Sequence, residues 1–186
     1  DSVMHGRDLV VASNGDVYVT LEGTGRRPGR PAPAGSASFV ALRDTNADGH
    51  ADIVKRVGAL GNTGIGIANG YLYVDEGAQV VRYARPDSQL VPTAKAEVVV
   101  DGIPMNPGHR ARNFAIGSDG SLYLNVGSPS NACQQKDRAD GSPGKEPCAE
   151  LATRAGTWRF DATKTNQHFS SAARFATASA SAFFLA

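Results

Sequence analysis

The sequence predicts an all-β fold, a β-propeller built of four-stranded antiparallel blades, and three observations favour it. Tight Asn-Gly or Asp-Gly turns, each between two apolar runs, recur at about 50-residue intervals, which is roughly the length of one propeller blade. The segments between turns are rich in β-branched and aromatic residues, with Gly, Pro and Asp at their ends. Almost no helical periodicity interrupts them. We therefore expect a propeller in preference to a β-sandwich.

Three hairpins define the repeat. Each consists of an apolar run, a tight turn and alternating Val, Leu and Tyr residues, which is the strongest short-range indication of a β-hairpin. The segments are LVVASNGDVYVT from Leu9, GIGIANGYLYVDEG from Gly64 and NFAIGSDGSLYLNVG from Asn113.

Third and fourth strands follow these hairpins. Third strands are expected in SFVALRD from Ser38, QVVRYARP from Gln79 and TWRFDA from Thr157, and fourth strands in ADIVKRVG from Ala51 and AEVVVDG from Ala96. The sequence thus predicts one partial propeller domain over residues 1–186, with blades at about 8–58, 64–102 and 112–177 and a divergent tail at 178–186. We expect about three and a half of about six blades, that is, part of a larger ring.

Strand order also predicts on which face each loop lies. Turns between first and second strands, and between third and fourth strands, lie on one face of a blade, and the remaining connections lie on the other. The connections 58–64 and 101–112 are therefore expected to share a face with the long loops 21–37 and 127–156. The acidic turn 44–52 is expected on the opposite face.

Composition excludes several classes of partner. The formal net charge of +1 gives no overall attraction to nucleic acid or to anionic lipid, and no aromatic residues interleave with the basic residues for stacking on bases. No stretch approaches the ~18 to 20 consecutive apolar residues of a membrane helix. We expect a soluble chain that binds no nucleic acid and does not insert into a membrane.

The two cysteines, Cys133 and Cys148, frame a loop that has no second Cys or His pair for zinc. This pattern favours a disulfide over a metal site. A disulfide persists in an oxidising compartment, so we expect a periplasmic or secreted protein.

A lone histidine, His109, lies in the loop that enters an innermost strand, where it would point toward the central axis. Histidine is the natural general base near neutral pH. The residues alone leave two interpretations open, a catalytic base and a solvated loop histidine.

Two further segments carry charge that could bind a ligand. Arg26, Arg27 and Arg30 lie in GRRPGRPAP, where they are either carboxylate-binding guanidinium groups or solvated charges on a loop.

The second segment, DTNADGHAD, follows the first nine positions of a calcium loop, in which alternate oxygens converge on the ion and Gly49 permits the turn. Lys55 stands where an EF-hand has its bidentate Glu. The segment is either a structural Ca²⁺ site or a plain Asp/Asn-rich hairpin. The candidate ligands are Asp44, Asn46, Asp48, His50 and Asp52.

Four segments together resemble the glucose/sorbosone dehydrogenase family, the soluble six-bladed propellers that use pyrroloquinoline quinone (PQQ). They are NGYLYVDEG, VVVDGIPM with His109 after it, GSLYLNVGSPSNAC and CAELATRAGTWRFDA, and the resemblance covers most of residues 8–177. It implies oxidation of a sugar or aldose hydroxyl with PQQ and Ca²⁺ as cofactors. It implies that His109 takes the proton from the sugar C1 hydroxyl while hydride passes to the quinone C5.

The same resemblance implies by position that Asn62 and Asn131 line the sugar site. Asn62 stands where the soluble glucose enzymes have a glutamine. For both residues the alternative is a loop amide that satisfies its own backbone.

The resemblance ends after RFAT, where the family continues with a glycine and an Arg-Asn pair and this sequence has Ala180 and Ser181. The family's later blades supply the remaining cofactor arginines, the lysine and the activating calcium ligands. We therefore expect a truncated member with weak or no turnover, whose cofactor-binding residues and electron acceptor the sequence leaves unassigned. The alternatives are a non-catalytic propeller module that binds calcium or carbohydrate, and an interaction domain that self-associates through open blade edges.

Overall fold

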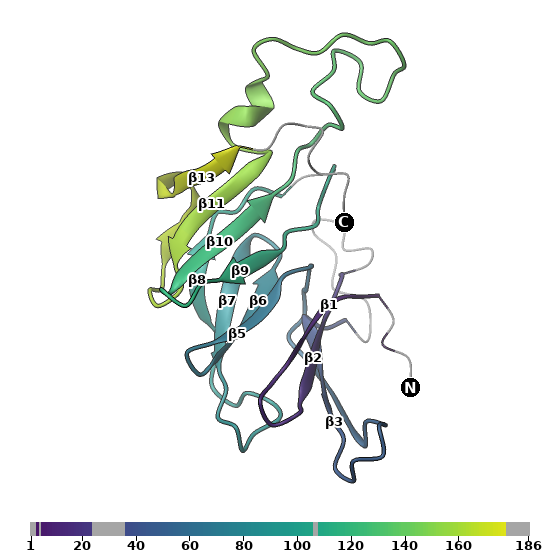
Figure 1. Cartoon of the computed structure of the whole chain (residues 1–186), viewed down its shortest axis with the longest axis vertical. Coiled ribbons are helices and arrows are strands. Elements are labelled where there is room, and N and C mark those ends of the chain that lie inside the picture. The colour runs from purple at the N-terminus through teal and green to yellow at the C-terminus, as the bar shows by residue number, and fades with distance from the viewer. Residues whose placement is uncertain (1–2, 4, 24–35, 106–107, 178–186) are drawn as a thin grey trace.

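The computed structural model describes residues 3, 5–23, 36–105 and 108–177, and these residues form three antiparallel sheets. In each sheet the main strands are hydrogen-bonded in chain order, so each is an up-and-down meander (Figure 1). The first sheet consists of β1 (Gly6–Val11), β2 (Val17–Leu21), β3 (Phe39–Arg43) and β4 (Ile53–Val57).

The second sheet consists of β5 (Ile65–Ala68), β6 (Tyr71–Glu76), β7 (Gln79–Ala84) and β8 (Glu97–Asp101). The third consists of β9 (Phe114–Ile116), β10 (Ser121–Val126), β11 (Gly156–Asp161) and β13 (Ala173–Thr177). Two short 3₁₀ helices, η1 (Ala149–Ala152) and η2 (Phe169–Ser171), are the only helices in the described part of the chain. The all-β, antiparallel prediction is confirmed, and the number of blades in a closed ring stays a prediction.

Local sequence explains the hairpins. Asn69 and Gly70 both have positive φ, 51° and 77°, which is the backbone of the two-residue type I′ turn that matches the twist of paired strands. The turn sets the register in which Ala68 lies opposite Tyr71, and the strands then pair through to Ile65 and Val74.

The first strands of the three sheets lie together. β5 contacts both β1 and β9, so the sheets are arranged side by side about a common edge, as the blades of a propeller are (Figure 1). One core cluster fills the space between the first and second sheets and includes Tyr18, Phe39 and Leu72. Another fills the space between the second and third sheets and includes Tyr73 and Leu122. Burial of these large side chains stabilises the stacking of the sheets.

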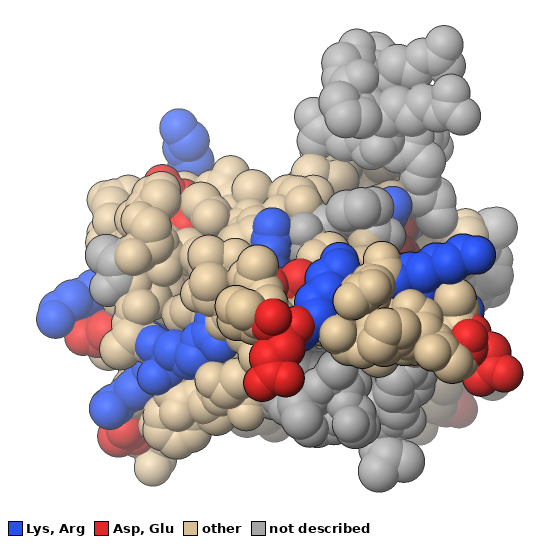
Figure 2. Space-filling view, turned by 90° about the horizontal axis from the view of Figure 1, so that it is seen from above, with Lys and Arg blue, Asp and Glu red and all other residues tan. Residues whose placement is uncertain are grey.

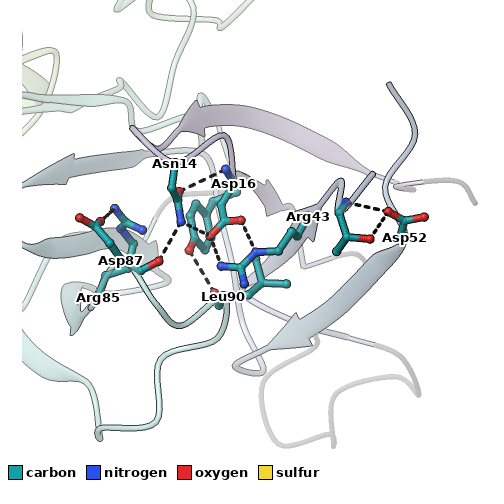
Figure 3. A network of polar contacts seen from close by, with 9 residues as sticks. Asn14, Asp16, Arg43, Asp52, Arg85, Asp87 and Leu90 are labelled. Atoms are coloured by element: carbon teal, nitrogen blue, oxygen red, sulfur yellow. Dashed lines mark hydrogen bonds and ion pairs between the residues drawn. The ribbon is translucent and has the colours of Figure 1, made fainter. Parts of the chain in front are cut away.

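A polar network joins the first sheet to the loop that follows β7 (Figure 3). Asp16 accepts two hydrogen bonds from Arg43, at 2.6 and 2.7 Å. Asn14 donates from Nδ2 to Asp16 and to the carbonyl oxygen of Asp87, both at 2.9 Å. The hydroxyl of Tyr18 donates to the carbonyl oxygen of Leu90 at 3.0 Å. The β1–β2 hairpin of the first sheet is thus hydrogen-bonded to the loop between β7 and β8 of the second sheet.

One strand was not predicted. β12 (Gln167–His168) lies between β11 and β13 of the third sheet in sequence. It pairs in parallel with β8 of the second sheet. The side chain of Gln167 donates to the carbonyl oxygens of Val99, at 3.3 Å, and Asp161, at 2.7 Å. A two-residue strand held by such long-range contacts has no periodic signal in the sequence.

Two of the loops lie at opposite ends of the molecule, as strand order predicts. Figure 1 shows the long loop between β10 and β11 at the top of the molecule and the turn between β3 and β4 at the bottom. Within the described residues, no helix is long and apolar enough to cross a membrane.

Candidate functional site

The loop that carries His109 packs tightly on the start of the long loop that follows β10. The backbone N–H of His109, which is half-buried, donates to the carbonyl oxygen of Ser128 at 3.1 Å. Gly127 lies directly against it, and a Cβ atom there would be 2.5 Å from the His109 carbonyl oxygen. A Cβ at Gly108 would likewise clash with the backbone of Pro129. The two loops therefore fix each other's backbone around His109.

A carboxylate holds the second of these loops in place. Oε2 of Glu150, in η1, accepts hydrogen bonds from the hydroxyl of Ser128, from the hydroxyl of Ser130 at 2.6 Å and from the N–H of Ser130 at 3.3 Å. Burial alone would raise the pKa of Glu150, but these hydrogen bonds hold the pKa below its usual value. Glu150 therefore acts as an ionised clamp on the segment that supports His109.

The predicted disulfide is present beside this clamp. Cys133 and Cys148 are joined, with their Cα atoms 6.1 Å apart. Both sulfur atoms and a carboxylate oxygen of Glu150 lie within 4.8 Å of one another. Because both sulfurs are in the disulfide, the group is no metal site. The disulfide fixes the end of the loop that precedes Glu150, and Glu150 in turn binds Ser128 and Ser130 at the start of the loop.

A buried ion pair lies on the other side of the His109 loop. Asp75, at the end of β6, has no exposed surface, and Arg112 is 3% exposed. Arg112 donates from Nη2 to Oδ1 of Asp75 at 2.9 Å and from Nε to Oδ2 at 3.2 Å, and it also donates to the carbonyl oxygen of Gly77. Burial raises the pKa of Asp75 to about 7, against the opposing attraction of Arg112.

Asn62 completes this arrangement. Its amide Nδ2 donates to Oδ2 of Asp75 at 2.7 Å and to the carbonyl oxygen of Arg110 at 3.1 Å. The predicted sugar-site residue thus lies beside the His109 loop, and its amide hydrogens hold that loop and the ion pair. Its Oδ1 accepts a long hydrogen bond from the hydroxyl of Thr63, at 3.5 Å.

Two guanidinium nitrogens at this site lack partners. Nη1 of Arg112 and Nη1 of Arg154 are both buried, and neither has a hydrogen-bond partner among the described residues. Burial lowers the pKa of Arg154, and the positive charge of Arg112 lowers it further.

Asn131 lies three residues beyond Ser128 and is half-buried, and its N–H donates to Oδ1 of Asp137 at 2.8 Å. Arg26, Arg27 and Arg30 lie outside the described residues, as do Ala180 and Ser181. Figure 2 shows the molecule from the side of the long loop, with basic and acidic side chains interspersed across it.

The acidic turn 44–52 joins β3 and β4 and lies at the opposite end of Figure 1 from the long loop between β10 and β11. Its carboxylates are turned onto its own backbone: Asp44 accepts from the N–H groups of Asn46, Ala47 and Gly49. Asp52 accepts from the N–H and hydroxyl of Thr45, and Asp48 from the N–H of His50. In the described part of the chain, no three acidic or histidine ligand atoms of this turn converge within 4.8 Å. The arrangement does not fit an ion as it stands, and calcium binding stays a prediction.

Sequence reasoning missed four residues of the site: Asp75, Arg112, Glu150 and Arg154. Asp75 lies near the end of β6 and Glu150 lies in η1, whereas Arg112 and Arg154 lie shortly before β9 and β11. Charged residues at such places are most often solvated. Only the burial of Asp75 and Arg112 and the hydrogen bonds of Glu150 distinguish them. A carboxylate within the strand segment YLYVDEG was the one signal that could have found Asp75.

The fold is similar to part of a solved PQQ domain, so the expected resemblance to PQQ sugar dehydrogenase-like propellers is confirmed at the level of the fold. The holo form of the pyranose dehydrogenase PQQ domain from Coprinopsis cinerea matches with a TM-score of 0.67 and 18% identity, covering 91% of this chain and 38% of that one. The calcium structure of a Trichoderma reesei carbohydrate-active enzyme of family AA12 matches with a TM-score of 0.67 and 15% identity, covering 93% of this chain and 40% of that one.

This chain therefore spans about two fifths of the length of these structures. No protein-family model and no curated protein matches its sequence.

Proposed function

We propose that this chain forms part of a propeller that oxidises a sugar hydroxyl with PQQ, with His109 as general base. The observation that carries the proposal is the His109 loop itself. Its backbone is fixed on both sides, by Ser128 and by Asn62, and the same loop presents an unpartnered guanidinium nitrogen of Arg112. The shared fold with the PQQ domain of a pyranose dehydrogenase supports it.

The residues present suit the cofactor. PQQ carries three carboxylates, and guanidinium groups bind carboxylates through paired, charge-assisted hydrogen bonds. Nη1 of Arg112 is a buried donor with no partner among the described residues, so a carboxylate would satisfy it. When bound, PQQ supplies the quinone that accepts a hydride from the sugar.

The chain's own residues supply the proton chemistry and the positioning. The imidazole of His109 accepts the proton of the sugar C1 hydroxyl as the C–H bond releases hydride, so that the alcohol carbon becomes a carbonyl. The hydrogen bond to Ser128, itself held by Glu150, keeps the His109 backbone in one place. We propose that Asn62 and Asn131 line the sugar.

The proposed location is supported by the disulfide. A bond between Cys133 and Cys148 requires an oxidising compartment, which supports a periplasmic or secreted protein.

The test is reduction of a redox dye by aldoses after addition of PQQ and Ca²⁺, together with retention of PQQ absorbance on gel filtration. His109→Gln should lower the rate by about 100-fold or more while cofactor retention and folding stay unchanged. Arg56→Gln, at an exposed position of β4, is the control and should keep the full rate. Equal rates for the wild type and His109→Gln would remove His109 as the base, and absence of both turnover and PQQ retention would refute the proposal.

The alternatives give different results in the same preparation. Sugar or calcium binding without turnover would indicate a non-catalytic module. A mass near twice 19.4 kDa would indicate self-association through blade edges.

A further inference from the structure

Cys133, Cys148 and Glu150 form the one group of the described chain in which three Cys, His, Asp or Glu ligand atoms lie within 4.8 Å of one another. Cys133 is buried, and the other two residues are half-buried. In the oxidised protein the two sulfur atoms are bonded to each other, so neither is a metal ligand. Reduction leaves two thiols beside a carboxylate, and zinc accepts both kinds of ligand.

The backbone brings the two cysteines together without help from the disulfide. Gln134 and Gly144 form a single antiparallel β-bridge. Next to it, the N–H of Lys145 donates to the carbonyl oxygen of Cys133 at 2.8 Å. The side chain of Gln134 closes the loop from within, because its Nε2 donates to two carbonyl oxygens of the same loop at 3.2 and 3.1 Å. None of these bonds involves sulfur, so the ends of the loop should stay paired when the disulfide is reduced.

Each cysteine is also fixed from outside this loop. The N–H of Cys133 donates to the hydroxyl of Ser130 at 3.0 Å, and that hydroxyl donates to Glu150 at 2.6 Å. The carbonyl oxygen of Cys148 accepts from the N–H of Leu151, in η1, at 3.1 Å. The thiols of a reduced chain should therefore remain near the carboxylate.

The carboxylate of Glu150 has one oxygen left for an ion. Its three hydrogen bonds, from Ser128 and Ser130, all go to Oε2. Within the described ranges no hydrogen bond goes to Oε1. A metal ion bound through Oε1 would thus leave the bonds to the two serines in place.

We propose that Cys133, Cys148 and Glu150 form a Zn²⁺ site in the reduced protein. Thiolates select soft or borderline metals over calcium and magnesium. In a tetrahedral zinc site the ligand atoms lie about 3.6 to 3.8 Å apart, as Zn–S and Zn–O bonds of about 2.3 and 2.1 Å require. The 4.8 Å limit within which the three ligand atoms lie leaves room for this arrangement, with water in the fourth position.

The disulfide and the metal site are exclusive states of one group. A dithiol reductant passes two electrons and two protons to the disulfide, which gives two thiols and the cyclic disulfide of the reductant. Zn²⁺ then binds the two sulfurs as thiolates and displaces both thiol protons. Neither PQQ nor a sugar takes part, so the site is independent of the proposed function.

The test is calorimetric binding of Zn²⁺ to the full chain, both oxidised and after reduction by a dithiol that is then removed without oxygen. One Zn²⁺ should bind per reduced chain, and the oxidised chain should lack this binding. Co²⁺ in place of Zn²⁺ should give the charge-transfer absorbance of a thiolate-bound metal in the reduced chain alone. Zn²⁺ should also raise the melting temperature of the reduced chain and leave that of the oxidised chain unchanged.

Variants of the reduced chain identify the ligands. Loss of a group that only supports a metal ligand already costs 10- to 100-fold in affinity, so Glu150→Gln should weaken Zn²⁺ binding by at least about 10-fold. Cys148→Ser should weaken it by at least about 100-fold. Glu146→Gln makes the same change as Glu150→Gln at an exposed position of the same loop, and it should bind as the reduced wild type does.

Several results would overturn the site. Equal Zn²⁺ affinity of the oxidised and reduced chains would place the metal elsewhere, as would an affinity that Glu150→Gln leaves unchanged. A Zn²⁺ ion shared by two chains, seen as a doubled mass, would exclude a site within one loop. A reduced chain that stays unfolded with Zn²⁺ would show that the backbone does not hold the cysteines together.

A measurement on the wild type covers the case in which Cys148→Ser does not fold. Zn²⁺ should protect both thiols of the reduced chain from alkylation. Thiols that are alkylated equally fast with and without Zn²⁺ would refute the proposal.

Discussion

Asp16→Asn should destabilise the fold, because Asp16 is the centre of the network that joins the first sheet to the loop after β7 (Figure 3). The side chain of Asp16 is 1% exposed and accepts both hydrogen bonds from Arg43. The substitution keeps the shape of the side chain and removes its charge. It leaves Arg43 without an anion.

The magnitude follows from the geometry of the pair. Removing one partner of a fully buried pair costs about 3 to 5 kcal/mol. Arg43 is 28% exposed and can recover part of its hydration, so we expect a loss of about 2 to 3 kcal/mol in the free energy of unfolding. For a chain of this size, that loss lowers the melting temperature by about 4 to 12 °C.

The pH dependence identifies the charge as the cause. The hydrogen bonds from Arg43 hold the pKa of Asp16 below its usual value, although burial opposes them. A carboxylate whose pKa is lowered by folding stabilises the protein at all pH values above its unfolded pKa, and the stabilisation is lost as the pH falls through the lower, folded pKa. The difference between the wild type and Asp16→Asn should therefore be complete at neutral pH and should vanish in strong acid.

Urea denaturation, with the midpoint and slope measured across this pH range, provides the assay. Asp140→Asn, an exposed carboxylate on the long loop, is the control and should leave the curves unchanged. A difference that stays constant from neutral to acid pH would refute the electrostatic explanation. So would an Asp16→Asn variant as stable as the wild type at neutral pH.

Three further predictions concern the support of His109. Gly127→Ala would bring a Cβ atom to 2.8 Å from the Cβ of His109, so it should displace that loop and lower PQQ-dependent dye reduction at least tenfold, a loss of about 1.4 kcal/mol in transition-state stabilisation. Glu150→Ala removes the acceptor of three hydrogen bonds and should cost about 2 kcal/mol in urea denaturation, with faster proteolysis of the loop after β10. Replacing Cys133 and Cys148 by Ser opens a 15-residue loop and should lower the free energy of unfolding by about 3 kcal/mol.

Matched variants test each of these. Gly144→Ala places its Cβ in open space and should leave dye reduction unchanged. Glu150→Gln keeps an oxygen acceptor and should lose less than Glu150→Ala; equal losses would mean that the hydrogen bonds contribute little. If the Ser double variant and the wild type unfold at the same urea concentration, the disulfide does not stabilise the fold.

Most of the fold is predictable because its determinants are local. The Asn69–Gly70 turn needs positive φ at both positions, and only a few residue types permit that, so the turn and the register of β5 and β6 are readable from neighbouring residues. Alternation of apolar residues then fixes which face of each strand is buried. Local rules therefore predicted the hairpins and the faces on which their loops lie.

The candidate site is less predictable because it depends on long-range pairs. Asp75, in the second sheet, is hydrogen-bonded to Arg112, which precedes the first strand of the third sheet. Glu150 is hydrogen-bonded to Ser128, which lies at the other end of the long loop after β10. No spacing rule relates such residues, since their separation in sequence is set by loop lengths. His109 could be named from a resemblance, whereas the unpartnered donor of Arg154 became visible only once its surroundings were known.

The crossing strand β12 has a consequence for how the molecule opens. In sequence it lies between two strands of the third sheet, but it is hydrogen-bonded to the outer edge of β8 in the second sheet. The amide protons at that edge should therefore exchange only when segments of both sheets separate. The second and third sheets should therefore protect their amides as one cooperative unit. The first sheet, joined to the second by side chains, should exchange its amides at a lower opening free energy, and the half of the fold that holds His109 should be the last to open.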